Sequence, residues 1–255
     1  MAAPLRVWFD LDGRVLRLRL DRPKANIVDA AMVAALDTAF AEHADDPGLA
    51  AIVLDHEGPN FSFGASIEEH LPDQCAAMLR SLHALVGRML DCRVPILSVV
   101  RGHCLGGGLE VVSAGGLIFA APDARFGQPE IRLTVFAPAA SCLLPERIGQ
   151  MRAEDLLITG RTIGADEGAN MGLVHEVAID PEKAALRYVE EQLLPLSASS
   201  LRFAVTAVRG AMAARVKANL ADVEALYLEG LMQSRDAVEG LNAFLDKRSP
   251  RWEHR

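Results

Sequence analysis

The sequence predicts an α/β protein whose C-terminal part is entirely helical. Short apolar runs alternate with segments of helical period through the first 180 residues, which is typical of an α/β core. From Pro181 onward every segment has helical spacing, in the ranges 181–194, 201–212, 220–233 and 237–248. We therefore expect a core over residues 1–196 and a helical region over 197–255 that packs on the core or on a neighbouring subunit.

The core is expected to begin with a hairpin. Asp12-Gly13, a favourable turn pair, lies between predicted strands at 7–10 and 15–20. Asp29 is placed to cap a helix with apolar residues on one face, namely Met32, Val33, Leu36 and Phe40. Further strands are predicted at 49–54, 95–100, 117–120 and 174–177. Helices are predicted over 72–90, 109–114, 138–148, 152–159 and 165–171.

Composition and missing motifs argue against several functional classes. The chain of 255 residues has 26 Lys and Arg against 34 Asp and Glu, and a net charge of −8 does not suit a nucleic-acid surface. It shows no membrane span and no signal peptide, so a cytoplasmic location is expected. Neither GxGxxG, GxxxxGK[ST] nor GxSxG occurs, and without HExxH or CxxC spacing no metal site is expected. The four cysteines are expected to be reduced thiols.

A glycine triplet is the first sign of a reactive site. Gly106, Gly107 and Gly108 follow a predicted buried strand, and glycines let a ligand approach the backbone closely. If a helix starts there, the Gly107 N–H has no partner inside that helix. Gly64-Ala65 is a second expected helix start that could offer another free N–H. Two such donors on one oxygen form an oxyanion hole, which stabilises an enolate as it forms.

Two glutamates are the second sign. Glu110 lies among Leu109 and Val111, and a carboxylate is costly to bury without a reason. Together with Glu130 it could activate a water molecule and deliver a proton. Each feature alone has an ordinary interpretation: the glycines as a tight turn, Glu110 as a residue interacting with a helix dipole, Glu130 as part of a loop. The occurrence of all these strings in one chain favours the catalytic interpretation.

Three strings carry a resemblance to a known family: Gly64-Ala65-Ser66, Gly106-Gly107-Gly108-Leu109-Glu110 and Gln128-Pro129-Glu130. They are similar to the Gly-Ala-Asp, Gly-Gly-Gly-x-Glu and Gln-Pro-Glu strings of the crotonase (enoyl-CoA hydratase/isomerase) superfamily. The resemblance implies a spiral of ββα repeats with an α-helical C-terminal trimerisation region, assembled as a homotrimer or homohexamer. It implies an acyl-CoA thioester as substrate and no separate cofactor, because coenzyme A is part of the substrate.

The resemblance also implies roles for individual residues. Ala65 and Gly107 would supply the oxyanion-hole N–H groups, and Glu110 and Glu130 would be the catalytic pair, with base and acid left unassigned. Residues expected to contact coenzyme A or the acyl group are Lys24, Ala25, Asn26, Phe63, Ser66, Ile67, Phe244 and Lys247. In the family the last two often come from a neighbouring subunit.

Departures from the common pattern point to a narrower group. Ser66 replaces the usual Asp, and residues 134–142 lack the usual Gly-Gly-Thr-Gln string. Segments 24–32, 61–70 and 126–145 resemble cyclohexa-1,5-diene-1-carbonyl-CoA hydratases of anaerobic benzoyl-CoA degradation. This implies hydration to 6-hydroxycyclohex-1-ene-1-carbonyl-CoA. The alternatives are a general enoyl-CoA hydratase or isomerase, another crotonase activity such as a C–C hydrolase or thioesterase, and a non-catalytic acyl-CoA-binding or interaction protein.

Overall fold

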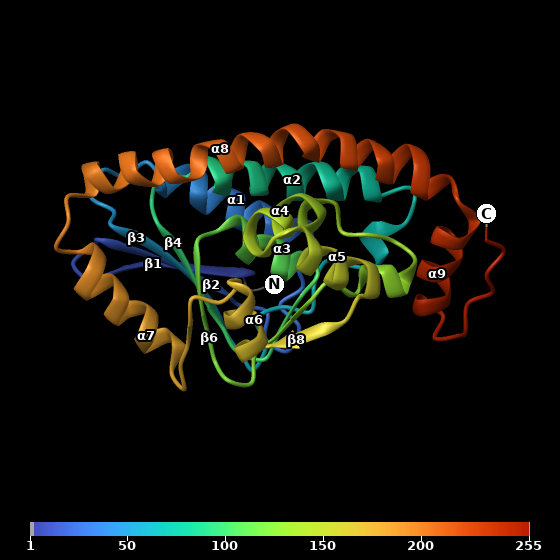
Figure 1. Ribbon diagram of the computed structural model, residues 1–255, viewed down its shortest axis with the longest axis horizontal. Coiled ribbons are helices and arrows are strands. Elements are labelled where there is room, and N and C mark those ends of the chain that lie inside the picture. Colours follow the sequence, from blue (N-terminus) through green and yellow to red (C-terminus); the bar gives the residue numbers. More distant parts are fainter. Residues whose placement is uncertain (1–2, 255) are drawn as a thin grey trace.

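A six-stranded sheet runs through the molecule (Figure 1). The computed structural model describes residues 3–254. In spatial order the strands are β1 (Leu5–Asp10), β2 (Val15–Leu20), β3 (Ala51–His56), β4 (Ile96–Val100), β6 (Leu117–Ala120) and β9 (Glu176–Val177). β1 and β2 form the predicted antiparallel hairpin, and every later neighbour pair is parallel. The central parallel strands β3, β4 and β6 are mostly apolar because both of their faces are covered.

A second, smaller sheet consists of β5 (His103–Leu105), β7 (Arg125–Gly127) and β8 (Thr162–Gly164). Isolated parallel bridges, Val28 with Ala65 and Ser62 with Cys104, extend the same arrangement. The sequence did not predict these strands, because three residues are too few to display a period of two. This sheet is nevertheless the part of the fold that brings the glycine strings together.

The chain forms a spiral of ββα turns, as predicted. Each turn adds a strand of the large sheet, then an extended segment at the small sheet, then a helix. The four helices that close these turns are α1 (Ala30–His43), α2 (Cys75–Asp91), α3 (Gly107–Ala114) and α4 (Pro138–Ile148). The predicted cap is present, since the Asp29 side chain accepts a hydrogen bond from Met32 N. Short 3₁₀ helices follow two of the extended segments, at Glu68–His70 and Pro129–Leu133.

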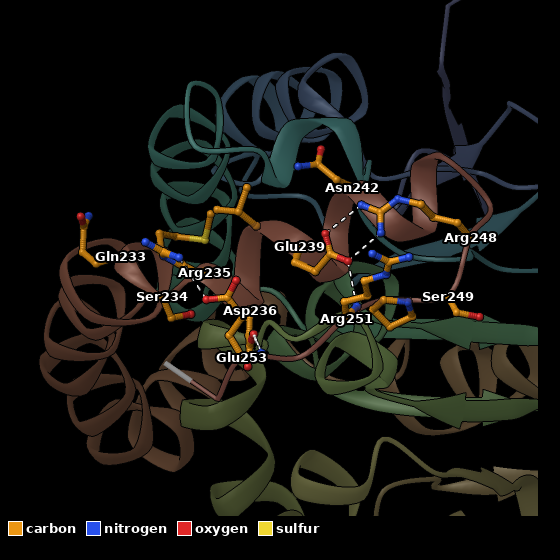
Figure 2. Close-up of a pocket in the computed structure, with 13 residues that line it drawn as sticks. Gln233, Ser234, Arg235, Asp236, Glu239, Asn242, Arg248, Ser249, Arg251 and Glu253 are labelled. Carbon is orange, nitrogen blue, oxygen red and sulfur yellow. Dashed lines mark hydrogen bonds and ion pairs between the residues drawn. The ribbon is translucent and has the colours of Figure 1, made fainter.

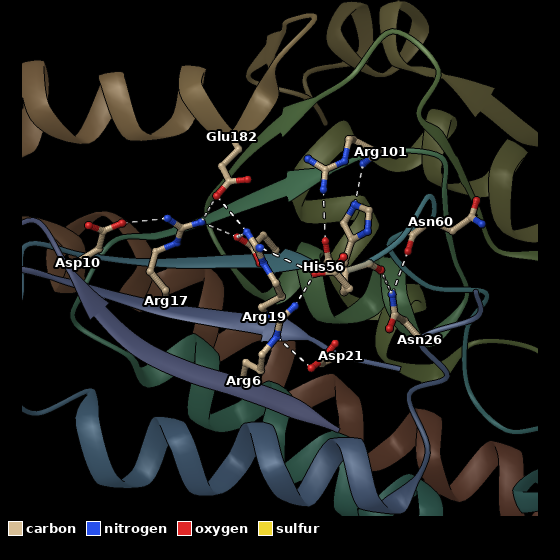
Figure 3. Close-up of polar contacts among 12 residues, drawn as sticks. Arg6, Asp10, Arg17, Arg19, Asp21, Asn26, His56, Asn60, Arg101 and Glu182 are labelled. Atoms are coloured by element: carbon tan, nitrogen blue, oxygen red, sulfur yellow. Dashed lines mark hydrogen bonds and ion pairs between the residues drawn. The ribbon is translucent and has the colours of Figure 1, made fainter. Parts of the chain in front are cut away.

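Helices cover both faces of the large sheet. One face packs through Leu16, Leu18 and Ile52 into the core beneath α1 to α4. The other packs on α7 (Pro181–Tyr188), which continues as a π-helical turn over Val189–Leu193. Figure 3 shows Glu182 of α7 reaching Arg17 and Arg19. Arg17 Nη2 also binds Oδ2 of the buried Asp55 at 2.6 Å. The ion pairs of Glu182 with Arg17 and Arg19 therefore link α7 to this face of the sheet.

The helical C-terminal region packs on the core of its own chain. After α5 (Gln150–Thr159) and α6 (Ala165–Met171), the long helix α8 (Ala198–Ala225) lies across α2 and α4 (Figure 1). A π-helical turn at Leu226–Gly230 and a 3₁₀ turn at Leu231–Gln233 then lead into α9 (Arg235–Leu245). None of the helices in the described range 3–254 combines the length and the apolar character needed to cross a membrane.

Two local predictions are wrong. The segments 201–212 and 220–233 belong to one continuous helix up to Ala225, because residues 213–219 contain neither Gly nor Pro to break it. The buried residues of α8 are Ala213, Val216 and Leu220, which lie in and just after the gap between the two predicted segments, so the apolar pattern of the sequence does not follow the buried face of the helix. Gly64-Ala65 does not start a helix either: Ala65 is extended and bridged to Val28.

Candidate active site

A cavity of about 480 Å³ brings several of the predicted residues together. Its walls are mostly apolar, and Ala65, Glu130 and Phe244 come from three distant parts of the chain. The cavity is also lined by Ile27, Phe63, Ser66, Ile67, Leu133, Val135 and Leu245. An apolar cavity with few polar groups is the usual form of a small-molecule site.

A larger hollow, of about 1100 Å³, lies around α9 and the residues that follow it (Figure 2). Its charged groups are paired with one another. Glu239 binds Arg248, with 2.6 Å between Oε1 and Nη1, and accepts a hydrogen bond of 2.8 Å from Arg251 N. Asp236 accepts hydrogen bonds from the backbone of Glu253 and His254. Because these contacts stabilise the C-terminal segment and no predicted catalytic group is present, we assign the chemistry to the smaller cavity.

The two predicted oxyanion-hole residues face each other. A Cβ placed on Gly107 would lie 3.2 Å from Ala65 N, so the two backbones are close and a larger residue would crowd Ala65. Within residues 3–254 neither N–H donates a hydrogen bond to another backbone or side-chain group. Gly107 is the first residue of α3, where the helix dipole adds positive potential. Both N–H groups are therefore available to one carbonyl oxygen.

Ala65 is held in place by strand-like contacts. Val28 N donates to Gly64 O at 2.9 Å, and Phe63 N donates to Ala25 O at 2.9 Å. The Ser62 hydroxyl accepts a hydrogen bond of 3.0 Å from Gly64 N. This donor is therefore positioned by the small sheet and not by the helix start that the sequence suggested.

Glu130 lies over the glycine turn. A Cβ on Gly106 would come within 2.4 Å of Glu130 Oε1, and Gly106 has φ +50° and ψ −129°, which disfavour any other residue. The backbone therefore favours glycine at this position, and a Cβ here would displace the Glu130 carboxyl group. Glu130 also lines the cavity directly.

Glu110 is 4% exposed and does not itself line the cavity. Its Oε1 accepts a hydrogen bond of 2.8 Å from Ala140 N, in the first turn of α4. A helix N-terminus is a favourable place for a negative charge. Residues 134–142, where the sequence departs from the common family pattern, therefore provide the contact that anchors Glu110.

The two glutamates differ in how they hold a proton. Burial raises the pKa of Glu110 to about 7, while hydrogen bonds from Ala140 and Ala139 favour its charged form. Burial and then the negative charge of Glu110 raise the pKa of Glu130 to about 8. Near neutral pH the pair therefore holds one proton, and the arrangement favours Glu130 as its carrier.

Sequence reasoning overlooked Gln128 as an individual functional residue. Its buried side chain lies between the Gly106 carbonyl and the Glu130 carboxyl group. With its amide nitrogen towards Glu130 it donates to Oε1 and Oε2 at 3.2 and 3.0 Å. With the opposite orientation Nε2 reaches Gly106 O at 3.4 Å, and the amide oxygen is free to accept the proton of a neutral Glu130. The position of Gln128 in the Gln-Pro-Glu string was the available signal.

Comparisons with known proteins agree with this geometry. The sequence profile described as enoyl-CoA hydratase/isomerase matches residues 11–255. The chain belongs to this family. A cyclohexa-1,5-dienecarbonyl-CoA hydratase from Thauera aromatica is 65% identical over 254 residues, 100% of this chain and 98% of that protein. A probable enoyl-CoA hydratase from Mycobacterium bovis is 34% identical over 253 residues, 98% of each chain.

The fold comparison gives the same family. The crystal structure of an enoyl-CoA hydratase from Mycobacterium avium matches with a TM-score of 0.86 and 26% identity, covering 98% of this chain and 99% of that one. An enoyl-CoA hydratase/isomerase structure from Pseudoalteromonas atlantica matches with a TM-score of 0.83 and 27% identity, over 98% and 99%. The crotonase-like spiral expected from the sequence is therefore present.

In this member of the family, the segment around Lys24 runs along one edge of the site. Lys24 is exposed, Ala25 is half-buried and Ile27 lines the cavity. Asn26 is fully buried, and its Nδ2 donates to Glu57 O and Asn60 O at 3.0 Å each (Figure 3). Asn26 can therefore act on a ligand by shaping this loop, whereas Lys24 is free to contact one directly.

The other predicted contacts surround the cavity mouth. Phe63, Ser66 and Ile67 all line it. The Ser66 hydroxyl points towards the following turn, where it donates to Glu68 Oε2 at 2.9 Å. Phe63 is stacked on His103, with 5.1 Å between ring centroids. His103 Nδ1 in turn lies 3.0 Å from Asn60 Oδ1.

The two contact residues predicted near the C-terminus, Phe244 and Lys247, lie in different places relative to the cavity. Phe244 lines the cavity of its own chain and is 53% exposed, so one subunit supplies this wall for itself. The neighbouring Leu245 lines the same cavity. Lys247 follows the end of α9 and is exposed, outside the lining. Its expected contact with coenzyme A stays a prediction.

Proposed function

We propose that this enzyme is a hydro-lyase that adds water reversibly to cyclohexa-1,5-diene-1-carbonyl-CoA, giving 6-hydroxycyclohex-1-ene-1-carbonyl-CoA. The observation that carries the proposal is the glutamate pair beside two backbone N–H groups that donate no hydrogen bond within residues 3–254. Glu130 lines an apolar cavity, and Glu110 lies close enough for its charge to raise the pKa of Glu130. The substrate rests on the 65% identity with the Thauera aromatica hydratase. We place the reaction in anaerobic benzoyl-CoA degradation.

The two backbone N–H groups would stabilise the negative charge that forms on the thioester oxygen during the reaction. The thioester oxygen would accept hydrogen bonds from Ala65 N and Gly107 N. Water oxygen then bonds to ring carbon 2, which lies β to the carbonyl group, and the electrons form a dienolate. A proton added at carbon 5 leaves a double bond between carbons 1 and 6. Renumbered, this is the 6-hydroxy-1-ene product. Because no electrons leave the substrate, the reaction needs no redox cofactor.

The glutamates then receive separate roles. Glu110 would be the base that takes the proton of the attacking water, because α4 favours its charged form. Glu130 would be the acid that protonates the ring, because its pKa is raised further by the charge of Glu110. After one turnover Glu110 holds the proton and Glu130 is charged. A proton must then pass between them, or through water, before the next cycle.

The pH profile tests this division. Hydration needs Glu110 charged and Glu130 neutral. We therefore expect kcat/KM to fall below about pH 7 as Glu110 gains a proton, and to fall above about pH 8 as Glu130 loses one. Initial rates from pH 5 to 10 give both limbs. A flat profile from pH 5 to 9 would contradict the assigned roles, since ordinary carboxyl groups titrate below this range.

The substrate assignment is tested by competition between thioesters. We expect the purified enzyme to hydrate the alicyclic dienoyl-CoA with a kcat/KM at least about tenfold above that for crotonyl-CoA, a difference a fitted pocket can supply. Products identified by mass and chromatography separate hydration from isomerisation or hydrolysis. Equal or faster hydration of crotonyl-CoA would instead assign the protein the general activity named for the Mycobacterium bovis relative.

We further propose that the active protein is a homotrimer or homohexamer. The support is the first half of α8, where Phe203 and Val208 are 77% and 83% exposed. Such apolar side chains on a long helix are suited to contact a second copy. Light scattering at micromolar concentration checks this, and a monomeric mass would refute it. The expected cytoplasmic location likewise stays a prediction.

A further inference from the structure

Tyr227 contains a buried polar group that the mechanism has not used. It lies in the π-helical turn Leu226–Gly230, where the end of α8 leads towards α9 (Figure 1). Its side chain is fully buried, and its hydroxyl has no hydrogen-bond partner among the described residues. An unsatisfied buried hydroxyl is unfavourable, and π-helical turns occur frequently at functional sites. The hydroxyl therefore requires an explanation.

The surroundings of Tyr227 connect it with the active site. It belongs to a cluster of buried apolar side chains that includes Val135, and Val135 lines the cavity. Its ring meets Phe136 edge to face, with 5.3 Å between centroids and 68° between planes. Leu133 and Ile67, which also line the cavity, pack against the same cluster. Tyr227 thus lies directly behind residues that line the cavity.

The hydroxyl is also within electrostatic reach of the reacting groups. Burial raises the pKa of Tyr227, and the Cys75 thiol and the charges of Glu130 and Glu110 raise it further. The phenol consequently stays protonated and remains a hydrogen-bond donor at any working pH. In an otherwise apolar cluster a phenylalanine would fill the same space without an unpaired donor.

We propose that the Tyr227 hydroxyl is a specificity-determining contact that donates a hydrogen bond to the oxygen added to the ring. This rests on the proposed function, since hydration is what brings a polar oxygen to the ring end of an apolar cavity. In the free enzyme the donor is unsatisfied, and the hydroxylated ring satisfies it. A thioester without the ring hydroxyl leaves the Tyr227 donor unpaired, so the contact discriminates between thioesters with and without that hydroxyl.

Tyr227→Phe removes only the hydroxyl and is the direct test. In the dehydration direction we expect kcat/KM for 6-hydroxycyclohex-1-ene-1-carbonyl-CoA to fall about tenfold, the effect of one lost hydrogen bond. The inhibition constant of cyclohexanecarbonyl-CoA, which lacks the hydroxyl, should stay within about twofold, since that ligand leaves the donor unpaired. The melting temperature should be unchanged or higher, because an unpaired buried group is removed.

Tyr188→Phe is the matched control, because Tyr188 is the other tyrosine of the chain and packs with Phe119 and His175 at the end of α7. It should leave both constants unchanged. The assignment is overturned if kcat/KM is unchanged in Tyr227→Phe, or if the inhibition constant of cyclohexanecarbonyl-CoA rises by the same factor as kcat/KM falls. A wild-type enzyme that hydrates crotonyl-CoA but does not dehydrate the hydroxylated ring overturns the proposed substrate instead.

Discussion

Replacing Glu110 or Glu130 by glutamine is expected to lower kcat of hydration by at least about 10²-fold, the contribution of a positioned acid or base. Glutamine keeps the shape and the hydrogen-bonding oxygen, so the amide oxygen in Glu110→Gln can still accept from Ala140 N. It can neither take up a proton from water nor release one to the ring. The amount of hydroxylated thioester formed with time at pH 7.5, separated from the dienoyl substrate by chromatography, measures the rate.

The double variant is expected to be little slower than the slower single variant, because we propose that both glutamates act in one proton-transfer unit. Glu42→Gln serves as the control, since Glu42 lies on the surface of α1 with a side chain 65% exposed. Near wild-type rates in both single variants would refute the two-glutamate mechanism. Additive losses would show that the two groups act in separate steps.

Thermal unfolding separates lost chemistry from lost folding. The raised pKa of Glu130 means that its stabilising contribution is complete below the unfolded-state pKa of about 4.5. That contribution is lost as the pH rises through about 8. Glu130→Gln has no such loss. Its melting temperature relative to wild type should therefore be higher at pH 9 than at pH 5, while its activity is low at both.

Gly106→Ala is expected to reduce kcat by about 10²-fold through the displacement of Glu130, the scale of losing a positioned acid. The new methyl group would lie 2.4 Å from Glu130 Oε1, on a backbone with φ +50° that favours glycine. The displacement changes the distance between the two carboxyl groups, so the pH at which the rate falls on the alkaline side should shift. Initial rates across pH measure both effects.

Gly149→Ala is the matched control for backbone strain. Gly149 has φ +80°, and no atom lies within 4 Å of the position that a Cβ would take, so this substitution strains the chain without touching the site. We expect both variants to have a lower melting temperature than wild type and only Gly106→Ala to have a lower kcat. Similar rates for the two variants would show that Gly106 does not position Glu130.

The fold was predictable where local rules decide it. The Asp12-Gly13 turn, the Asp29 cap and the apolar runs of the parallel strands follow from turn chemistry, capping and periodicity. The small sheet was not predictable, because its strands have three residues each and are defined by their partners. The unbroken α8 was divided in two because its buried positions are sparse.

The sequence by itself determined which chemical groups are available: two glycine turns, two glutamates and an apolar chain to bury them. Only the tertiary structure decided how they act. Ala65 meets Gly107 through the small sheet, and Glu110 receives its hydrogen bond from a residue thirty positions later. Burial and charge repulsion depend on distances in space, so the order in which Glu110 and Glu130 give up protons cannot be inferred from their spacing in the chain.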